Sequence, residues 1–276
     1  MPFFIKKTWT ATMIRLLLEK NFPTLFTPLR QMPEIKPSTK TEAVYVDVHS
    51  HLLPDLDEGA DCLEISFLII KELVKMGYQK LILTPHIMAE FYPNSPKRIR
   101  ENLQQLNDFV KRNGLLISLE VAAEYYLDDS FVKMLLTNQE LLTFGTPNEK
   151  PFLLFETSLV NEPHALFEAI KRIQLRGLKP ILAHPERYIY LQHNYEKIHE
   201  LHEAGVLFQV NINSFSGYYA KAAQELAEYL SVAQMISFVA TDCHNLQQVQ
   251  SIKKSITSFT YQTTLKSGTV LNNLLL

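Results

Sequence analysis

The chain has few cysteines, and this scarcity already excludes several classes of protein. Its 276 residues include two cysteines, Cys62 and Cys243, which form no CxxC pair. Two isolated cysteines exclude a zinc ribbon and a disulfide framework. Neither is followed six residues later by arginine, so the nucleophile loop of cysteine phosphatases is absent as well.

The chain also lacks an excess of basic residues and any long apolar run. Lys and Arg number 27 against 29 Asp and Glu, for a formal net charge of −2, which provides no global basic field to attract nucleic acid. The longest apolar runs, such as residues 67–70, are far shorter than the roughly 20 residues of a membrane-spanning helix. Behind Lys6 and Lys7 there is no apolar stretch of a secretory signal. We therefore expect a cytoplasmic protein without membrane insertion or a nucleic-acid partner, and its oligomeric state stays open.

Residues 1–40 differ from the rest of the chain. Residues 9–20 have the pattern of a short amphipathic helix, and four prolines then interrupt any regular element: Pro23, Pro28, Pro33 and Pro37. The remaining chain, within a sequence that is 46% hydrophobic, is long enough to bury one large core. We predict an N-terminal extension over residues 1–40 and a single domain over residues 41–276.

Short apolar runs alternate with helical patterns through this domain. The runs begin near Val44, Leu81, Ile117, Phe152, Pro180, Leu207 and Ser237. Helices are expected over residues 63–76, 96–113, 130–136, 165–176, 195–204 and 222–234. Glycines that suit a left-handed helix cap follow four of them: Gly77, Gly114, Gly177 and Gly205. Because the runs are almost continuously apolar, as in parallel strands buried on both faces, seven such units predict an α/β fold, a distorted TIM-like (β/α)7 barrel.

Side chains that bind metals stand where these runs end. Five of the nine histidines do so: His49, His51, His86, His184 and His244. Three acids share this position: Glu124, Glu156 and Asp242. Since the carboxyl ends of parallel strands converge on one mouth of a barrel, these imidazoles and carboxylates predict a site for two or three divalent ions. The other four histidines fall on loop or helix positions and are expected at the surface: His164, His193, His199 and His202.

The spacing within two motifs strengthens this interpretation. His49 and His51 are two residues apart, so in a strand both imidazoles point to the same side. Asp242 and His244 repeat the spacing, with Cys243 expected to face the opposite way into packing. Taken alone, each motif has another reading, as surface histidines or as an aspartate that caps a helix, and Glu58 could be a solvated turn residue. The coincidence at six strand ends favours the metal site.

Polar and aromatic residues beside the expected ligands suggest a substrate site. Arg187 follows His184 by three residues, where a guanidinium would bind a phosphate oxygen and offset charge in the transition state. The alternative is a salt bridge to Glu186 or another nearby acid. Amides of one strand would line the same mouth: Gln209, Asn211 and Asn213. Aromatic residues would form walls that suit a flat substrate ring, unless they serve packing: Phe91, Tyr92, Tyr188, Tyr190, Tyr218 and Tyr219.

The segments that carry these residues resemble the polymerase and histidinol phosphatase (PHP) superfamily. They are especially similar to its bacterial protein tyrosine phosphatases encoded with capsule and exopolysaccharide systems. The matching segments occur in order and cover roughly residues 44–245: DVHSHLLPDLDEG, TPHIM, AAEYYLD, FETS, ILAHPERY, QVNINSFSGYY and ATDCHN. The resemblance implies a trinuclear site, usually of the manganese type, with iron or zinc as alternatives. It also implies that the substrate is phosphotyrosine on a partner protein, the tail of a bacterial tyrosine autokinase.

The resemblance further implies a role for each residue by position. One ion would be held by His49, His51 and Asp242, with Glu124 bridging to a second. The second would be completed by Glu156 and His184, and the third held by Glu58, His86 and His244. Arg187 matches the phosphate-contacting arginine of the family motif. Two positions depart from the family: Glu58 stands where aspartate is common, and Gln247 and Gln248 stand where some relatives have a second arginine.

These assignments predict hydrolysis of phosphotyrosine by a metal-activated water. A tyrosine phenolate, with a pKa near ~10, leaves with little proton help, and His86 or His244 would serve as acid where it is not committed to metal. One alternative is a phosphoesterase that acts on a small metabolite such as histidinol phosphate. Amide or lactam hydrolysis is disfavoured by Arg187 and by Glu124 at the bridging position in place of lysine. A non-catalytic binding module is disfavoured by the complete ligand set.

Overall fold

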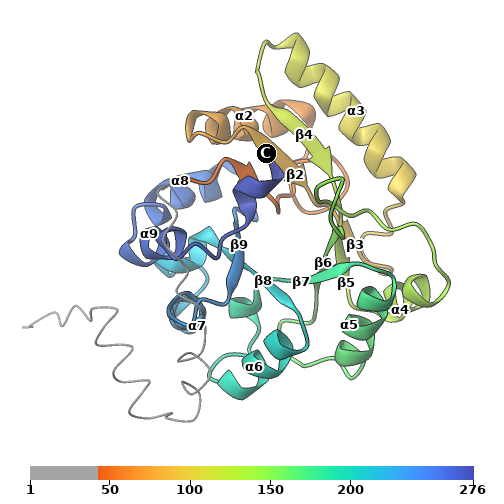
Figure 1. Ribbon diagram of the computed structural model, residues 1–276. Helices are drawn as coiled ribbons and strands as arrows, with labels where there is room; N and C mark the ends of the chain where they lie inside the picture. The colour runs from red at the N-terminus through yellow and green to blue at the C-terminus, as the bar shows by residue number, and fades with distance from the viewer. Residues whose placement is uncertain (1–42) are drawn as a thin grey trace, which may run out of the picture.

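The computed structural model describes residues 43–276. Our prediction of an extension over residues 1–40 lies outside the described residues, and the domain boundary at residue 41 stays a prediction. The described part is an α/β fold in which parallel strands alternate with helices. In Figure 1 the strands surround a central region and the helices lie outside them. None of the helices in residues 43–276 has the length and apolar character needed to cross a membrane.

The strands form two sheets, and all of their pairings are parallel. The first sheet has the order β1-β2-β4, with β1 (Val46–Asp47), β2 (Lys80–Leu83) and β4 (Ser118–Val121). The second has the order β3-β5-β6-β7-β8-β9, with β3 (His86–Ile87), β5 (Glu124–Tyr126), β6 (Phe152–Glu156), β7 (Lys179–Ala183), β8 (Leu207–Asn211) and β9 (Ile236–Ala240).

Two of the expected strands are each divided into two short pieces. β2 and β3 are separated by Thr84 and Pro85, and the proline has no N–H to donate to the sheet. β4 and β5 are separated by Ala122 and Ala123. The backbones nevertheless stay paired across the breaks, because Ala122 N donates to Leu83 O at 2.9 Å. The breaks thus divide the parallel array into two sheets without separating the neighbouring segments.

The six predicted helices are present, with ends within two residues of the expected positions. They are α2 (Leu63–Lys75), α3 (Pro96–Arg112), α4 (Asp129–Leu136), α5 (Leu166–Leu175), α6 (Tyr195–Glu203) and α7 (Lys221–Val232). Side-chain caps explain several starts; for example, Ser95 accepts from Arg98 N and Asp128 accepts from Phe131 N. The four glycines after helices all have positive φ, as predicted for left-handed caps. Two helices follow β9, α8 (Leu246–Ser255) and α9 (Phe259–Lys266).

The buried apolar side chains form two clusters. The larger one includes the inner faces of the helices, such as Ile69, Leu106 and Leu226. The smaller one collects strand residues together with Phe144 and Leu275: Val46, Val48, Ile82, Ala122, Phe152, Leu154, Ile181, Ala183, Phe238 and Ala240. Residues two apart on a strand share a face, so Phe152 and Leu154 of this smaller cluster lie in line with Glu156.

The first and last strands are joined by side chains and by a short backbone bridge. Asn272, in the 3-10 helix η5 (Asn272–Leu275), donates to Val46 O at 2.9 Å and Val239 O at 2.8 Å and accepts from Val239 N at 3.1 Å. Further along, Ser50 and Cys243 form an isolated parallel bridge. These contacts place the end of β1 beside the end of β9.

Candidate metal centre

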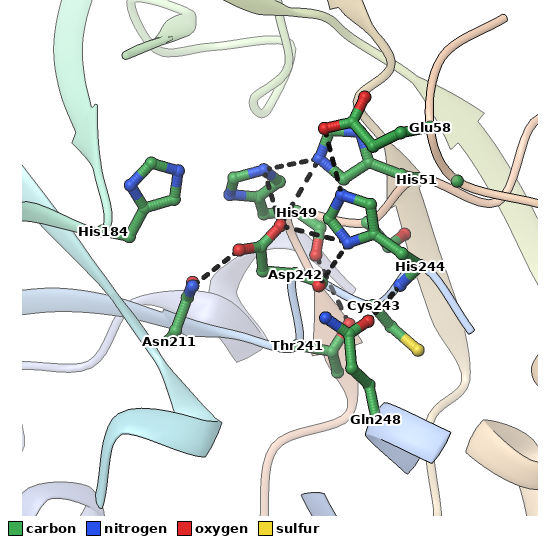
Figure 2. Close-up of polar contacts among 12 residues, drawn as sticks. His49, His51, Glu58, His184, Asn211, Thr241, Asp242, Cys243, His244 and Gln248 are labelled. Atoms are coloured by element: carbon green, nitrogen blue, oxygen red, sulfur yellow. Dashed lines mark hydrogen bonds and ion pairs between the residues drawn. The ribbon is translucent and has the colours of Figure 1, made fainter. Parts of the chain in front are cut away.

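All nine residues predicted to bind metal lie together, at or just beyond the carboxyl ends of strands or at the breaks that divide β2 from β3 and β4 from β5, and all but Glu58 are mostly buried. They are His49, His51, Glu58, His86, Glu124, Glu156, His184, Asp242 and His244. Figure 2 shows several of them converging around Asp242. Three groups have ligand atoms within 4.8 Å of one another: His51, His86 and His244; His49, His51 and Glu124; and His86, Glu124 and Glu156. The side chains that the sequence predicted as ligands therefore lie in one location, and their binding of metal stays a prediction.

Four ligand-type atoms face one another at the centre of the cluster. The Nε2 atoms of His49 and His51 are 3.1 Å apart. Both face Glu124 Oε2, at 3.1 and 3.4 Å, and Asp242 Oδ1, at 3.5 and 3.4 Å. These are the four residues that the family resemblance implies for one ion, with Glu124 as the bridge.

Glu124 connects this group to a second one. Its other oxygen, Oε1, lies 3.0 Å from His184 Nε2. Nδ1 of His86 lies 3.2 Å from Glu124 Oε2 and 3.0 Å from Glu156 Oε1. Because both carboxylate oxygens of Glu124 face different imidazoles, this side chain has the position of a bridging ligand.

Glu58 marks a third group, on the more exposed side of the cluster. Its Oε1 lies 3.1 Å from His86 Nε2 and 3.8 Å from His244 Nε2. The His244 ring stacks on the His51 ring with 4.1 Å between centroids. The glutamate side chain, half-exposed at 47%, therefore reaches both histidines with which the sequence grouped it.

Hydrogen bonds at Nδ1 orient three of the imidazoles. Nδ1 of His49 bonds to Gln209 Oε1 at 2.7 Å, Nδ1 of His51 to Asp57 Oδ2 at 2.8 Å, and Nδ1 of His244 to Asp242 O at 2.9 Å. Each of these partners is an acceptor, so Nδ1 donates to it and Nε2 is the nitrogen directed into the cluster. Such outer partners orient the histidine ligands of metal sites.

Asp57 is a residue of the site that the sequence analysis missed. Besides holding His51, its Oδ2 accepts from His86 N at 3.0 Å and its Oδ1 from Gly59 N at 3.0 Å. Gly59 is required by close approach, because a Cβ there would lie 2.0 Å from His51 O. The sequence indicates the turn, since an acid two residues before a glycine is typical of one, but it does not indicate the contact of Asp57 with His51.

Two of the ligand-type residues have strained backbones. His184 has φ 32° and Asp242 has φ 47°, both in the left-handed region that non-glycine residues seldom occupy. His184 directly follows the last residue of β7, and Asp242 lies two residues beyond the end of β9. Such conformations cost on the order of 1–3 kcal/mol each and concentrate at functional sites. The strain turns these side chains into the cluster.

The buried charges shift the pKa values of the cluster strongly. Burial would raise the pKa of Glu124, but the neighbouring His49 and His86 hold it well below its usual value. Burial likewise would raise the pKa of Asp242, and His49 and His51 lower it instead. Burial would lower the pKa of His86, and Glu124 nevertheless raises it to about 10. The carboxylates of Glu124 and Asp242 are thus ionised and directed at nitrogen atoms.

This donor set fits divalent metal ions. Imidazole nitrogens and carboxylate oxygens are ligands for Zn, Mn and Fe, and buried carboxylates are costly unless they are paired or bind a cation. Three imidazoles direct Nε2 into the cluster while Nδ1 bonds to an acceptor outside it. The number of converging atoms exceeds the coordination of one ion, so the cluster can hold more than one.

Arg187 lies beside the cluster and pairs with Asp242. Its Nη1 donates to Asp242 Oδ2 at 3.1 Å, while Oδ1 of the same carboxylate faces His49 and His51. The salt bridge that we considered is therefore present, but its partner is Asp242 and not Glu186. The guanidinium side chain is 26% exposed, so it also remains open to a ligand.

Glu186 has a structural role that the sequence analysis did not assign. It is fully buried, and its Oε1 accepts from Asn211 N at 2.9 Å and from Ser214 Oγ at 2.6 Å. Burial raises the pKa of this carboxyl group. Glu186 ties the turn after β7 to the end of β8, and it thereby places Arg187 next to Asn211.

Two predicted substrate-binding residues do not line the opening. Tyr188 is fully buried and its hydroxyl accepts from Thr157 N at 3.2 Å. The 3-10 helix η3 (Pro185–Arg187) turns the chain after His184 and directs this ring into the core. Asn213 is buried as well, and its Oδ1 accepts from Ser255 Oγ of α8 at 3.3 Å. β8 ends at Asn211 and η4 (Ile212–Ser216) follows, so the alternation that would have aligned Asn213 with Asn211 stops.

The remaining aromatic residues divide between the site and the surface. Tyr92 stacks on His86, with 5.6 Å between centroids, and Tyr219 lies under Arg187. Tyr190 stacks on the buried Tyr188, whereas Phe91 is 70% exposed.

Cys243 is buried and packs in the larger apolar cluster, as predicted. The four histidines predicted to lie outside the site are absent from the three ligand groups formed by the described residues. His199, for example, bonds to Tyr229 Oη on the helical layer at 2.8 Å.

Comparisons with known proteins identify relatives of this chain. It is 29% identical over 202 residues to the tyrosine-protein phosphatase YwqE of Bacillus subtilis (strain 168), covering 73% of this chain and 78% of that protein. It is 28% identical over 207 residues to the tyrosine-protein phosphatase CpsB of Streptococcus pneumoniae, covering 73% and 83%.

A solved structure from a crystallographic study of YwqE and CpsB, described as unique metal-dependent tyrosine phosphatases, superposes with a TM-score of 0.69. The sequence identity is 26%, and the match covers 83% of this chain and 90% of that one. A family model, described as capsular polysaccharide synthesis, CpsB/CapC, matches residues 45–265, which include every residue of the metal cluster. The chain therefore belongs to the CpsB/CapC family of capsular polysaccharide synthesis.

Proposed function

We propose that the chain is a metal-dependent phosphatase that hydrolyses phosphotyrosine in proteins. The observation that carries the proposal is the convergence of Glu124 and Asp242 on His49 and His51: each carboxylate has an oxygen within 3.5 Å of both imidazole Nε2 atoms, and a half-buried arginine pairs with the same aspartate. Family membership and the names of the relatives support the same activity. The substrate we propose is a tyrosine-phosphorylated protein, the tail of a bacterial tyrosine autokinase in capsule or exopolysaccharide synthesis.

We assign the nine clustered residues to two or three divalent ions, with manganese as the expected metal. Bound there, such ions would stabilise charge on phosphate oxygens and activate water as a nucleophile. His49, His51 and Asp242 would hold one ion, Glu156 and His184 would complete a second, and Glu124 would bridge the two. Glu58, His86 and His244 would hold the third.

The side chains of the protein would orient the phosphate and donate a proton to the leaving phenolate. Arg187 has guanidinium donors beyond the one used by Asp242, and these can bind a phosphate oxygen. Asn211 lies on the other side of Asp242, where its Nδ2 donates to Oδ2 at 2.6 Å. A phenolate with a pKa near ~10 needs little protonation to leave. His86 and His244, next to the exposed Glu58, are placed to give that proton where they do not bind an ion.

The fold we propose for this site is a distorted (β/α)7 barrel. Divided strands count once, so that β2 with β3 and β4 with β5 each fill one position. The Asn272 hydrogen bonds and the Ser50–Cys243 bridge support closure between β1 and β9. Closure would bring the first and last pairs of ligands together, as their distances require. The cytoplasmic location stays a prediction from the sequence.

The proposal is tested by comparing substrates and metals directly. Protein purified without chelator should contain at least two equivalents of Mn, Fe or Zn, and chelation should abolish hydrolysis until Mn is restored. Turnover of a phosphotyrosine peptide should exceed that of histidinol phosphate in kcat/KM. One equivalent of metal or fewer, with activity that survives chelation, would refute the metal mechanism. Faster turnover of histidinol phosphate would refute the substrate class.

A further inference from the structure

Tyr219 and Arg187 form part of a closed ring of contacts at the edge of the metal cluster. The guanidinium carbon of Arg187 lies 4.7 Å from the centroid of the Tyr219 ring. The Tyr219 hydroxyl accepts from Asn211 Nδ2 at 3.2 Å, and the same Nδ2 donates to Asp242 Oδ2 at 2.6 Å. Asp242 Oδ2 in turn accepts from Arg187 Nη1 at 3.1 Å. Each residue of the ring thus contacts two others.

The ring of contacts fixes one edge and one face of the planar guanidinium group of Arg187. Asp242 holds one edge of the planar group, through Nη1, and the tyrosine ring covers one face. Within residues 43–276, Asp242 is the only side chain that forms a hydrogen bond with this guanidinium. The remaining edge therefore keeps donors in a defined plane, and a paired contact with an oxyanion depends on that plane.

Tyr219 belongs to the segment that joins η4 to α7, outside both elements. Asn211 is the last residue of β8 and is anchored through its backbone by Glu186. Since Asn211 holds the tyrosine hydroxyl, the strand end determines where the aromatic ring lies. The adjacent Tyr218 is 43% exposed, and its ring meets Tyr219 edge-on at 5.0 Å.

We propose that Tyr219 is a positioning residue, which orients the Arg187 guanidinium toward the substrate phosphate. The inference rests on the proposed phosphatase function. The aromatic face is the part that acts, because a cation over an aromatic face is stabilised and restricted in orientation. The hydroxyl serves to hold the ring in place.

The test uses the Mn-loaded full chain and three variants, Tyr219→Leu, Tyr219→Phe and the control Phe167→Leu. Tyr219→Leu should reduce kcat/KM for a phosphotyrosine peptide about tenfold, within the strength of a partly buried cation–π contact. Tyr219→Phe keeps the ring and should stay within about threefold of wild type. Phe167→Leu removes a 40% exposed ring on α5 that lies under Lys197 at 5.1 Å, and it should change kcat/KM by less than about twofold. Melting temperature and metal content identify any variant that is merely misfolded.

Combination with Arg187→Ala separates positioning from general packing. If Tyr219 acts through the guanidinium, Tyr219→Leu should have almost no further effect once Arg187 is alanine, since coupled residues are not additive. An equal tenfold loss in both backgrounds would overturn the proposal. So would a wild-type kcat/KM in Tyr219→Leu.

Titration with inorganic phosphate keeps this test independent of the proposed activity. In calorimetry on the Mn-loaded protein, Tyr219→Leu and Arg187→Ala should both weaken phosphate binding, and Phe167→Leu should not. That result would support the positioning role even if the wild type failed to hydrolyse phosphotyrosine. Unchanged phosphate affinity in Tyr219→Leu would overturn it.

Discussion

The two ends of the same parallel strands differ sharply in chemistry. At the amino ends and along the strand interiors, the small cluster contains only apolar side chains, such as Phe152, Ile181 and Phe238. Just past the carboxyl ends, equally buried positions contain histidines and acids, among them His49 and Glu124, both 0% exposed. One end is stabilised mainly by apolar burial, whereas the other holds ionised groups that favour a cation. The comparison predicts that substitutions at the two ends should have different measurable effects.

The alternation of side chains connects the two ends along β6 and β9. Phe152, Leu154 and Glu156 lie two residues apart in β6, and only the last is charged. Phe238 and Ala240 of β9 and Asp242 beyond it show the same change from apolar to charged residues. A strand presents residues i and i+2 on one face, so each of these columns changes from apolar to ligand-type at its carboxyl end.

The largest effect should follow from substitution of the bridging acid. Glu124→Gln keeps the size of the side chain but removes the charge that faces His49, His86 and His184. Metal stabilisation worth several kcal/mol should be lost, and kcat/KM should fall roughly 10³-fold or more. The measurement is phosphotyrosine-peptide kinetics together with elemental analysis, which should show fewer metal equivalents than in wild type.

Glu120→Gln is the control for that change. Glu120 lies on the neighbouring strand β4, and its side chain is 49% exposed beside Lys80. An exposed ion pair contributes about 0–1 kcal/mol, so activity and metal content should be unchanged. Full activity in Glu124→Gln would mean that the carboxyl-end cluster is not the reaction site.

At the opposite end, Phe238→Ala should affect stability and not chemistry. Phe238 is fully buried and contacts Phe144 and Phe152 edge-on, at 6.2 and 5.2 Å. Removal of such a ring costs about 3–5 kcal/mol in the free energy of unfolding, which urea denaturation would measure. The folded fraction should keep its metal content and kcat. Phe259→Ala, at a ring that is 69% exposed, is the matched control and should change stability little.

Arg187→Ala, a substitution at the carboxyl ends of the strands, should reduce the rate of turnover. Loss of a charged contact to a transferring phosphoryl group costs about 2.7–4 kcal/mol, or 10²–10³ in rate. Arg187→Lys should recover only part, because an ammonium cannot form the paired contact. Metal content should be unchanged in both variants. Lower melting temperature with normal kcat/KM would show that the ion pair with Asp242 is the whole role of this residue.

Asn272→Ala tests the contacts between β1 and β9 at the apolar end. The substitution leaves Val46 O, Val239 O and Val239 N without their side-chain partner. At about 1 kcal/mol for each lost bond, the free energy of unfolding should fall by about 3 kcal/mol. Thermal and urea unfolding are the measurements. A variant as stable as wild type would show that these bonds do not hold the first and last strands together.

The smallest effect is expected for the cysteines. Burial raises the pKa of the Cys243 thiol, and its Sγ donates to Asn245 O at 3.5 Å, so the thiolate form is disfavoured. Activity of the double variant Cys62→Ser, Cys243→Ser should stay within about threefold of wild type, since inert thiols do no chemistry. A loss beyond about a hundredfold, with fold and metals intact, would point to thiol chemistry.

Local sequence patterns were sufficient to predict the helices and to identify the candidate metal ligands. The 3.6-residue periodicity and the glycine caps identified α2 to α7, because these signals lie within about a dozen neighbouring residues. The same signals did not reveal the division of β2 from β3, which depends on pairing with other strands. Tyr188 and Asn213 were wrong as substrate contacts because 3-10 turns end the strand alternation immediately before them.

The outer partners of the site could not be predicted from the sequence. Gln209 was expected to line the mouth, but its bond to His49 joins residues 160 positions apart. Asp57 holds His51 in a turn whose geometry depends on the approach of Gly59. The ring formed by Arg187, Asp242, Asn211 and Tyr219 draws on three separate segments.

The sequence by itself determined which side chains stand at the strand ends and therefore which chemistry is available there. Hydrophobic periodicity decides where a strand stops, and residue type decides what can bind a metal. Only the tertiary structure decided how those side chains meet: which Glu124 oxygen faces which imidazole, and which face of Arg187 is covered. Those relations depend on strand pairing, on the left-handed turns at His184 and Asp242, and on packing between distant segments, because no local pattern encodes the distance between residues far apart in the chain.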